Sequence, residues 1–335
     1  MKCMKVKMTI WSAMAAMVLV SAAGLAQTPA APATLAAPQA GTGQVTFPKV
    51  DLKNFTADSP TTAEVDSFLR SMWGYDDNRV WEVAGILKTA APGVSKVVVY
   101  IADKSQPEKG TSTVFFTTPD GKHAIADRVI NFGANPFVEN RALLQARANG
   151  PSHGAKSNDL MLVEFADLQC PHCKEGQEMM KNLAADFPEA KIVFENFPLT
   201  EVHPYAAQAA AVGVCVRKLK GDDAFFNYVQ NVFDKQDGLT AANVTVTLNT
   251  AVTAAGGDPT AVNTCAATQP AKDEVIAGRK LGEDLGIEQV PTIVVNGYVL
   301  TLGAVPYNVL RRIVAYRANQ DGIPVHLQPQ LTTLR

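Results

Sequence analysis

The residues best suited to chemistry are Cys170 and Cys173, which are separated only by Pro171 and His172. A pair at this spacing can be redox-active, can form half of a zinc site, or can be two buried thiols without a chemical role. A tetrathiolate zinc site usually has a second closely spaced pair, whereas the other cysteines of the chain are scattered. We therefore favour thiol-disulfide chemistry, with zinc and inert thiols as the alternatives.

The segments on either side of this pair predict how it is positioned. Residues 160–165 form an almost continuous apolar run, typical of a central strand covered on both faces. Pro171 suits the first turn of a helix, and residues 174–185 are mostly good helix formers. Cys170 then stands at a helix N-terminus, where unpaired N–H groups and the helix dipole favour an anion.

The charges near the pair act in the same direction. His172 and Lys174 add positive potential, so we expect the pKa of Cys170 to lie below that of an ordinary thiol. In a redox pair, Cys170 is the nucleophile, exposed at the start of the helix. Cys173, one turn further along, is the buried resolving thiol.

The N-terminus has the layout of an export signal. Lys2, Lys5 and Lys7 precede a mildly apolar segment, residues 8–26, which is rich in Ala and Met. We expect residues 1–26 to be a signal peptide cleaved after Ala26, with an uncleaved membrane anchor as the alternative. In both cases the remainder is exported to the periplasm or another extracytoplasmic space, where disulfides persist.

Length, composition and charge narrow the class of protein. The chain has 335 residues, enough for two domains, and is 47% hydrophobic. Cleavage would remove three lysines and no acids, which changes the formal net charge from −2 to −5. We therefore expect no nucleic-acid partner. Residues 27–44, built mainly from Ala, Pro, Thr, Gln and Gly, predict a flexible linker.

Residues 45–149 predict a small α+β domain without catalytic residues. An apolar face indicates a helix after Pro60, and a second helix is expected at residues 79–89. Strands are expected at residues 96–101, 113–117 and 124–130, with a turn at residues 119–122 that joins the last two. Residues 150–158, which contain Gly, Pro and Ser, predict a hinge.

Residues 159–317 predict a second domain. A strand at residues 191–197 follows the first helix after a short crossover, which implies parallel pairing. Residues from about 203 to 286 are mostly helical, although residues 239–253 fit either a helix or a strand. Asn296-Gly297 predicts a hairpin between β-branched runs, followed by a closing helix at residues 306–316. Residues 318–335 are expected to be a loosely attached tail.

This order of elements resembles the DsbA-like family of exported thiol-disulfide oxidoreductases. The resemblance is carried by four motifs: Val163-Glu164-Phe165 leading into Cys170-Pro171-His172-Cys173; Phe197-Pro198-Leu199 with His203-Pro204; Gln289-Val290-Pro291-Thr292; and Asn296-Gly297. It implies an α/β fold, namely a thioredoxin fold with an inserted helical subdomain, preceded here by the small α+β N-terminal domain.

The resemblance also implies roles for individual residues. Pro291 should follow a cis peptide bond opposite the cysteines and expose backbone for an extended substrate. Val290 before it, like Pro171 and His172, is typical of the oxidase DsbA. Glu164 should be a buried acid beneath the cysteines that assists proton transfer to or from the buried thiol, with a strand-end carboxylate in solvent as the alternative.

Four further residues have expected positions. Asp167 is expected on the loop surface, and His203 at the start of a helix or, alternatively, on the substrate surface. The four cysteines that follow the signal peptide allow three pairings. Cys215 and Cys265 are expected to form a structural disulfide worth about 3 to 4 kcal/mol. A shuttle that exchanges with the active pair is the alternative.

The leading hypothesis is an exported dithiol oxidase that introduces disulfides into unfolded or partly folded proteins with free thiols. We expect no cofactor. The resemblance implies reoxidation by a membrane quinone-linked partner, either DsbB-type or vitamin K epoxide reductase-like. The first domain resembles the dimerisation domains of the DsbC and DsbG isomerases, so a homodimeric isomerase or reductase is the close rival. A non-enzymatic exported chaperone is a third hypothesis.

Overall fold

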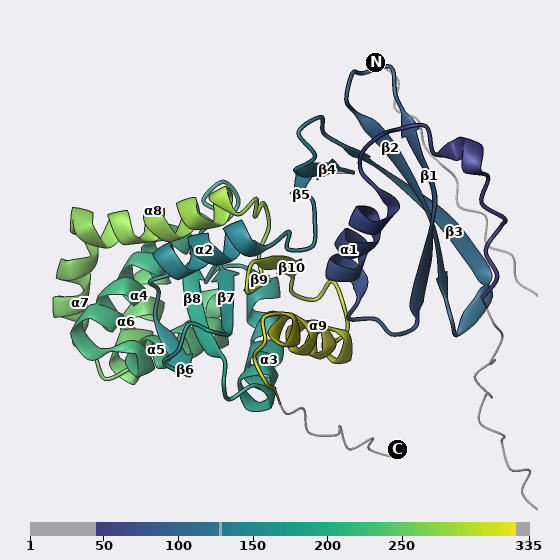
Figure 1. Cartoon of the computed structure of the whole chain (residues 1–335). Helices are drawn as coiled ribbons and strands as arrows, with labels where there is room; N and C mark the ends of the chain where they lie inside the picture. The colour runs from purple at the N-terminus through teal and green to yellow at the C-terminus, as the bar shows by residue number, and fades with distance from the viewer. Residues whose placement is uncertain (1–44, 127–128, 326–335) are drawn as a thin grey trace, which may run out of the picture. The chain divides into compact units, whose positions relative to one another are not determined.

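A computed structural model describes residues 45–126 and 129–325 of the chain. The predicted signal peptide, residues 1–26, and the predicted linker, residues 27–44, lie outside the described residues. Within the described part, the strands form two sheets (Figure 1). Buried apolar side chains pack against each of them. In that same part, no helix has the length and apolar character needed to cross a membrane.

The first sheet is an antiparallel meander with α1 (Thr62–Trp73) packed on one face. Thr61 and Glu64 form a capping box at the start of α1, which satisfies two free N–H groups there. A short 3-10 helix, Leu52–Asn54, precedes it. In order, the strands are β1 (Arg79–Lys88), β2 (Ser95–Asp103), β3 (Gln106–Thr117), β4 (His123–Ile125) and β5 (Val129–Asn131).

The predicted helix at residues 79–89 is wrong, because these residues form β1. Val83 and Ile86 are both buried, and this spacing of three also fits one face of a helix. In the strand it arises because the pairing with β2 shifts between Val83 and Gly85. Such a bulge adds a residue to one strand and moves the next side chain to the opposite face.

The second sheet has the strand order β10-β9-β7-β8-β6. Its central strand, β7 (Met161–Ala166), is buried at every residue. β7 runs parallel to β8 (Lys191–Asn196), and α3 (Pro171–Asp186) forms the crossover between them. β9 (Thr292–Val295) and β10 (Tyr298–Thr301) form the predicted hairpin, whose turn residues Asn296 and Gly297 both have positive φ.

Helices cover both faces of this sheet (Figure 1). One face packs against α3 and α9 (Tyr307–Gln320), and the Tyr307 hydroxyl donates to Asp186 Oδ2 at 2.7 Å to join the two helices. The other face packs against α2 (Val138–Arg147) and the helical insertion. This topology confirms the predicted fold class, a thioredoxin fold with an inserted helical subdomain after a small α+β domain.

The insertion lies between β8 and β9. It comprises α4 (Ala206–Lys220), α5 (Asp222–Asp234), the 3-10 helix Gln236–Gly238, α6 (Val244–Ala254), α7 (Pro259–Ala266) and α8 (Gln269–Asp284). The ambiguous residues 239–253 therefore contain a helix, not a strand. A disulfide joins Cys215 on α4 to Cys265 on α7, with 5.8 Å between their Cα atoms.

The predicted hinge and the start of the predicted tail contain a strand and the end of a helix. The expected hinge, residues 150–158, contains β6 (Ser152–Gly154), which pairs antiparallel with β8. Gly150 permits this pairing, because a Cβ there would clash with the Phe194 carbonyl. Leu144 of α2 is also buried in the hydrophobic core between the second sheet and the insertion, so residues before 159 pack with the predicted second domain. At the other end, α9 continues to Gln320, three residues into the predicted tail.

Removing the Cys215–Cys265 bond should destabilise the chain without disturbing the sheet. The bond closes a loop with a sequence separation of 50 residues. We expect the Cys215→Ala, Cys265→Ala double variant to lose about 3 to 4 kcal/mol of unfolding free energy in urea denaturation. The matched control is Cys170→Ala, Cys173→Ala measured without reductant, so that the Cys215–Cys265 bond stays intact. An equal loss in both double variants would contradict this assignment.

Candidate active site

Cys170 lies at the point where the loop after β7 meets α3. It is the N-cap residue of that helix, and Pro171 occupies the first turn. It is only 5% exposed, so the expectation of an exposed nucleophile is wrong. The Val290 carbonyl oxygen lies 4.0 Å from its Sγ, on the segment that folds over the helix start. Only a narrow part of the sulfur is therefore open to a partner.

Hydrogen bonds lower the pKa of Cys170 to about 6. The largest contribution is the hydrogen bond from the Cys173 thiol, followed by the backbone N–H groups of Cys173 and His172 and by the positive charge of His203. Burial opposes these effects. His172 itself is exposed, and its hydrogen bond with Glu175 raises the pKa of its imidazole. Cys170 is thus largely a thiolate at neutral pH when the pair is reduced.

Cys173 has the opposite environment. It is fully buried, and burial, the largest cause, together with the neighbouring Cys170 sulfur, raises the pKa of its thiol well above the ordinary value. The Asp167 N–H donates to Cys173 Sγ at 3.3 Å and partly offsets that effect. Both cysteines are free thiols in this structure. The two sulfurs therefore differ strongly in their ability to hold a negative charge.

Glu164 lies on β7 beneath the pair. It is 3% exposed and does not reach solvent, which rules out the alternative of a strand-end carboxylate in water. Burial raises its pKa to about 7, and the hydrogen bond from Gln177 Nε2 at 2.7 Å opposes the rise. The same amide nitrogen lies 3.2 Å from the Cys173 carbonyl oxygen. Gln177 thus connects the acid to the helix that carries both cysteines.

The Val290–Pro291 peptide bond is cis. Pro291 faces Gly176 on α3, where a Cβ atom would lie 3.4 Å from Pro291 Cγ. A groove of about 450 Å³ runs along this contact. Its lining includes His172, Met179 and Leu302 in addition to Gly176, Val290 and Pro291.

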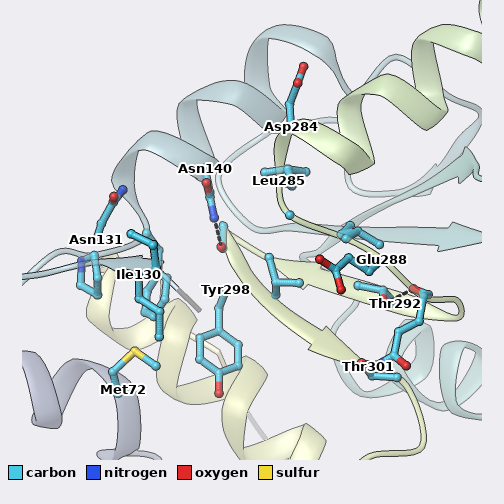
Figure 2. A pocket seen from close by; sticks show the side chains of 18 residues that line it. Met72, Ile130, Asn131, Asn140, Asp284, Leu285, Glu288, Thr292, Tyr298 and Thr301 are labelled. Atoms are coloured by element: carbon cyan, nitrogen blue, oxygen red, sulfur yellow. Dashed lines mark hydrogen bonds between the residues drawn. The ribbon is translucent and has the colours of Figure 1, made fainter. Parts of the chain in front are cut away.

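The β9–β10 hairpin, which follows the cis bond, is fixed by side-chain hydrogen bonds at its turn and at its open end (Figure 2). Asn140 of α2 donates to the Gly297 carbonyl at 3.1 Å. At the other end, Thr292 Oγ1 donates to the Gln289 carbonyl at 2.8 Å, and Gln289 Nε2 donates to Thr301 Oγ1 at 2.8 Å. These bonds fix the segment that contains Val290 and Pro291.

Two glutamines hold the loop that carries Cys170, and the sequence did not predict either. Gln236 Nε2 donates to the carbonyl oxygens of Leu168 and Cys170, each at 3.0 Å. Gln169 accepts from the Tyr205 N–H at 2.7 Å and donates to the Leu239 carbonyl at 3.1 Å. Only Gln177 had a sequence signal, since it lies one turn after Cys173 and on the same helix face.

The sequence predicts Asp167 on the loop surface, and this expectation is wrong. Its side chain is buried, because it accepts hydrogen bonds from the backbone N–H groups of Gln169 and Leu199, at 2.7 and 2.8 Å. His203 Nδ1 lies 2.8 Å from Asp167 Oδ2. Cys215 and Cys265 are bonded to each other within the insertion, apart from this cluster.

A family model described as thioredoxin matches residues 147–314, half of the chain. The chain belongs to the thioredoxin family. The match covers the second sheet, the insertion and both cysteines of the pair. It confirms the thioredoxin fold expected from the sequence motifs, and the matched region begins before the predicted hinge.

Several solved structures are similar to this chain. The catalytic domain of Proteus mirabilis ScsC is 24% identical with a TM-score of 0.45, over 53% of this chain and 98% of that chain. BdbD from Bacillus subtilis, in its oxidised form, is 21% identical with a TM-score of 0.45, and the match covers 51% of this chain and 93% of BdbD. The thiol-disulfide exchange protein α-DsbA2 from Wolbachia pipientis is 20% identical with a TM-score of 0.45, over 53% and 95%. The family assignment rests on the family match and the topology, not on these likenesses.

Shorter matches connect the chain to curated proteins. A stretch of 57 residues is 37% identical to the Na(+)/H(+) antiporter NhaA 3 of Salinispora tropica, over 17% of this chain and 9% of that protein. A stretch of 81 residues is 33% identical to the Na(+)/H(+) antiporter NhaA 1 of Mycolicibacterium vanbaalenii, over 24% and 13%. The matched parts thus span about a tenth of these relatives, and antiporter activity does not follow from them.

The buried acids should make the stability of the protein fall as pH rises. Burial raises the pKa of Glu164 and of Glu195 to about 7, whereas an unfolded glutamate titrates near 4.5. Between these pH values the native state binds more protons than the unfolded chain, so the free energy of unfolding decreases with pH. The stabilising contribution is complete below about pH 4.5 and is lost above about pH 7.

We therefore expect Glu164→Gln to be more stable than the wild type at pH 8, by roughly 2 to 3 kcal/mol, and about equally stable at pH 4.5. Urea denaturation at the two pH values measures the difference. Glu195→Gln should behave alike, whereas Glu178→Gln, an exposed change on α3, should leave the pH dependence unchanged. The test uses the disulfide form, in which Cys170 does not titrate. In that form, a wild-type stability that rises from pH 5 to 7.5 would contradict the raised pKa values of Glu164 and Glu195.

Proposed function

We propose that this chain is an exported protein disulfide oxidoreductase that works mainly as a dithiol oxidase, donating the Cys170–Cys173 disulfide to folding proteins. The observation that carries the proposal is the contrast between the two thiols: the pKa of Cys170 is lowered to about 6, whereas burial raises that of Cys173. A stabilised thiolate favours the reduced pair, and a stable reduced form makes the disulfide a stronger oxidant. Electrons then flow from the client to the enzyme.

The reaction begins with the disulfide form. A client thiolate attacks Cys170 Sγ, the S–S bond breaks, and Cys173 leaves with the electron pair. Because a negative charge at Cys173 is disfavoured by burial, this sulfur takes up a proton. Glu164 supplies that proton, since its pKa of about 7 leaves a fraction of the carboxyl protonated at neutral pH.

A second client thiolate then attacks the client sulfur in the mixed disulfide. Cys170 leaves as the stabilised thiolate, and the client disulfide is released. The client has lost two electrons and two protons. The enzyme pair has gained the two electrons, and Cys173 keeps the proton that Glu164 supplied. Of the two protons lost by the client, one restores the Glu164 carboxyl and the other passes to solvent.

Client recognition is proposed to use the groove beside Pro291. An extended client segment would pair with the backbone exposed by the cis bond while its cysteine reaches Cys170. The apolar side chains of Met179 and Leu302 suit an unfolded or partly folded protein. His172 and Glu175 form the polar rim.

The wider setting follows from the family resemblance. The chain is proposed to work in the periplasm or another extracytoplasmic space, where clients with free thiols emerge. The reduced pair is then reoxidised by a membrane quinone-linked partner, DsbB-type or vitamin K epoxide reductase-like. The rival proposal, an isomerase, would require a homodimer formed through residues 45–149. The third proposal, a chaperone, would require the two cysteines to stay permanently bonded.

The redox potential of the Cys170–Cys173 couple tests the direction. Equilibration with reduced and oxidised glutathione should give a value above about −200 mV for an oxidase. Cys170→Ser should abolish exchange, whereas Cys173→Ser should accumulate a mixed disulfide with the client. The Cys215→Ala, Cys265→Ala variant is the control and should keep the potential. A value near −270 mV, typical of thioredoxin, would contradict the proposal.

The groove can be tested separately. Gly176→Val would place methyl groups against Pro291 and Leu302, where a Cβ already makes contacts of 3.4 and 3.7 Å. We expect roughly a tenfold loss in the rate of client oxidation, equivalent to about 1.4 kcal/mol, because the added methyl groups narrow the groove. The glutathione equilibrium should change less than about twofold. Lys181→Val, an exposed change on the same helix, is the control. Equal losses with client and with glutathione would argue against the groove.

A further inference from the structure

The mechanism above leaves one cluster beside the thiols unused, the pair formed by Asp167 and His203. Asp167 lies in the loop before α3, and His203 lies in the segment before α4. Their side chains meet at 2.8 Å, between Asp167 Oδ2 and His203 Nδ1. Because a carboxylate only accepts hydrogen bonds, Nδ1 carries the proton, and the charge of the ring depends on Nε2.

Asp167 is well placed to hold the imidazole in one orientation. Its buried carboxylate also accepts the N–H groups of Gln169 and Leu199, so it is fixed from two chain segments. Its own N–H donates to Cys173 Sγ at 3.3 Å. A single residue thus connects His203 to the sulfur of the resolving thiol.

The positive charge of a protonated His203 acts on Cys170. Among the causes that lower the pKa of Cys170, the Cys173 thiol is the largest, and His203 is the imidazole that contributes through its charge. The His203 side chain is 18% exposed, whereas that of His172 is 77% exposed. Water screens an exposed charge much more than one enclosed by protein, so His203 is the more effective cation of the two.

We propose that His203 is a positioning residue of the thiol site, oriented by the buried Asp167 carboxylate so that its imidazolium stabilises the Cys170 thiolate. The assignment rests on the proposed exchange reaction and adds a tuning element to it. Besides His203, Cys173 and His172 on α3 act on Cys170, and Glu164 on β7 acts on Cys173. In the mixed disulfide, the same charge makes Cys170 a better leaving group when the client disulfide is released.

Substitutions at His203 separate charge from loop anchoring. Asn at position 203 can still donate to Asp167 but carries no charge, whereas Lys keeps a cation beside the carboxylate. We expect His203→Asn to raise the pKa of Cys170, followed by thiolate absorbance, by about half a pH unit and to lower the glutathione equilibrium constant about threefold. His203→Lys should stay within about twofold of the wild type. His123→Asn, which removes an exposed imidazole near Asp120, is the matched control.

A measurement on the wild type provides a second test that needs no variant. If His203 stabilises the Cys170 thiolate, the thiolate stabilises the imidazolium by the same free energy. The chemical shifts of the His203 ring protons, measured at one neutral pH, should therefore be closer to those of an imidazolium in the reduced protein than in the disulfide form. Identical shifts in the two forms would overturn the proposal.

The outcomes distinguish this inference from the proposed function. Should His203→Asn lower the melting temperature while the Cys170 titration and the equilibrium constant stay unchanged, the pair only anchors the loop and the inference fails. Should wild-type protein show no exchange with glutathione at all, the proposed function fails instead. If His203→Asn lowers the glutathione equilibrium constant and His203→Lys keeps it near the wild-type value, the result supports both the inference and the proposed function.

Discussion

The site depends on one constraint, that two sulfur atoms a single helical turn apart must lie in opposite environments. Cys170 is at a helix end, where N–H groups stabilise a negative charge, and Cys173 lies where water does not reach. This is achieved where β7 ends in a hydrophobic core at Ala166 and a short loop leads into α3 at Pro171. β7, buried at every residue, brings the chain to that point, and Pro171 starts the helix there.

Most groups that hold this arrangement come from distant parts of the chain. Gln236 of the insertion binds the carbonyl of Cys170, and Gln169 is bound by backbone groups of Tyr205 and Leu239. The helical insertion therefore takes part in the site through hydrogen bonds, although it supplies neither cysteine. The geometry of the Cys170 loop therefore depends on how the insertion packs on the sheet.

What the sequence predicted was local. The apolar run of β7, the position of Pro171, and the Asn296-Gly297 turn each specify structure within a few residues, and these predictions match the structure. The helix predicted for β1 failed because a bulge changes the periodicity that distinguishes a strand from a helix. The burial of Asp167 also could not be predicted, since its partners Leu199 and His203 lie far along the chain. The same holds for Cys170, which is covered by the segment that carries Val290.

The second disulfide has a consequence for how each copy matures. Cys215 is fully buried in the folded insertion, so its bond to Cys265 has to form while that region is still open to an oxidant. Under the proposed function, finished copies of the protein are themselves such an oxidant. A newly exported chain is then a client of its predecessors before it becomes a donor, and the first copies depend on another source of oxidising equivalents.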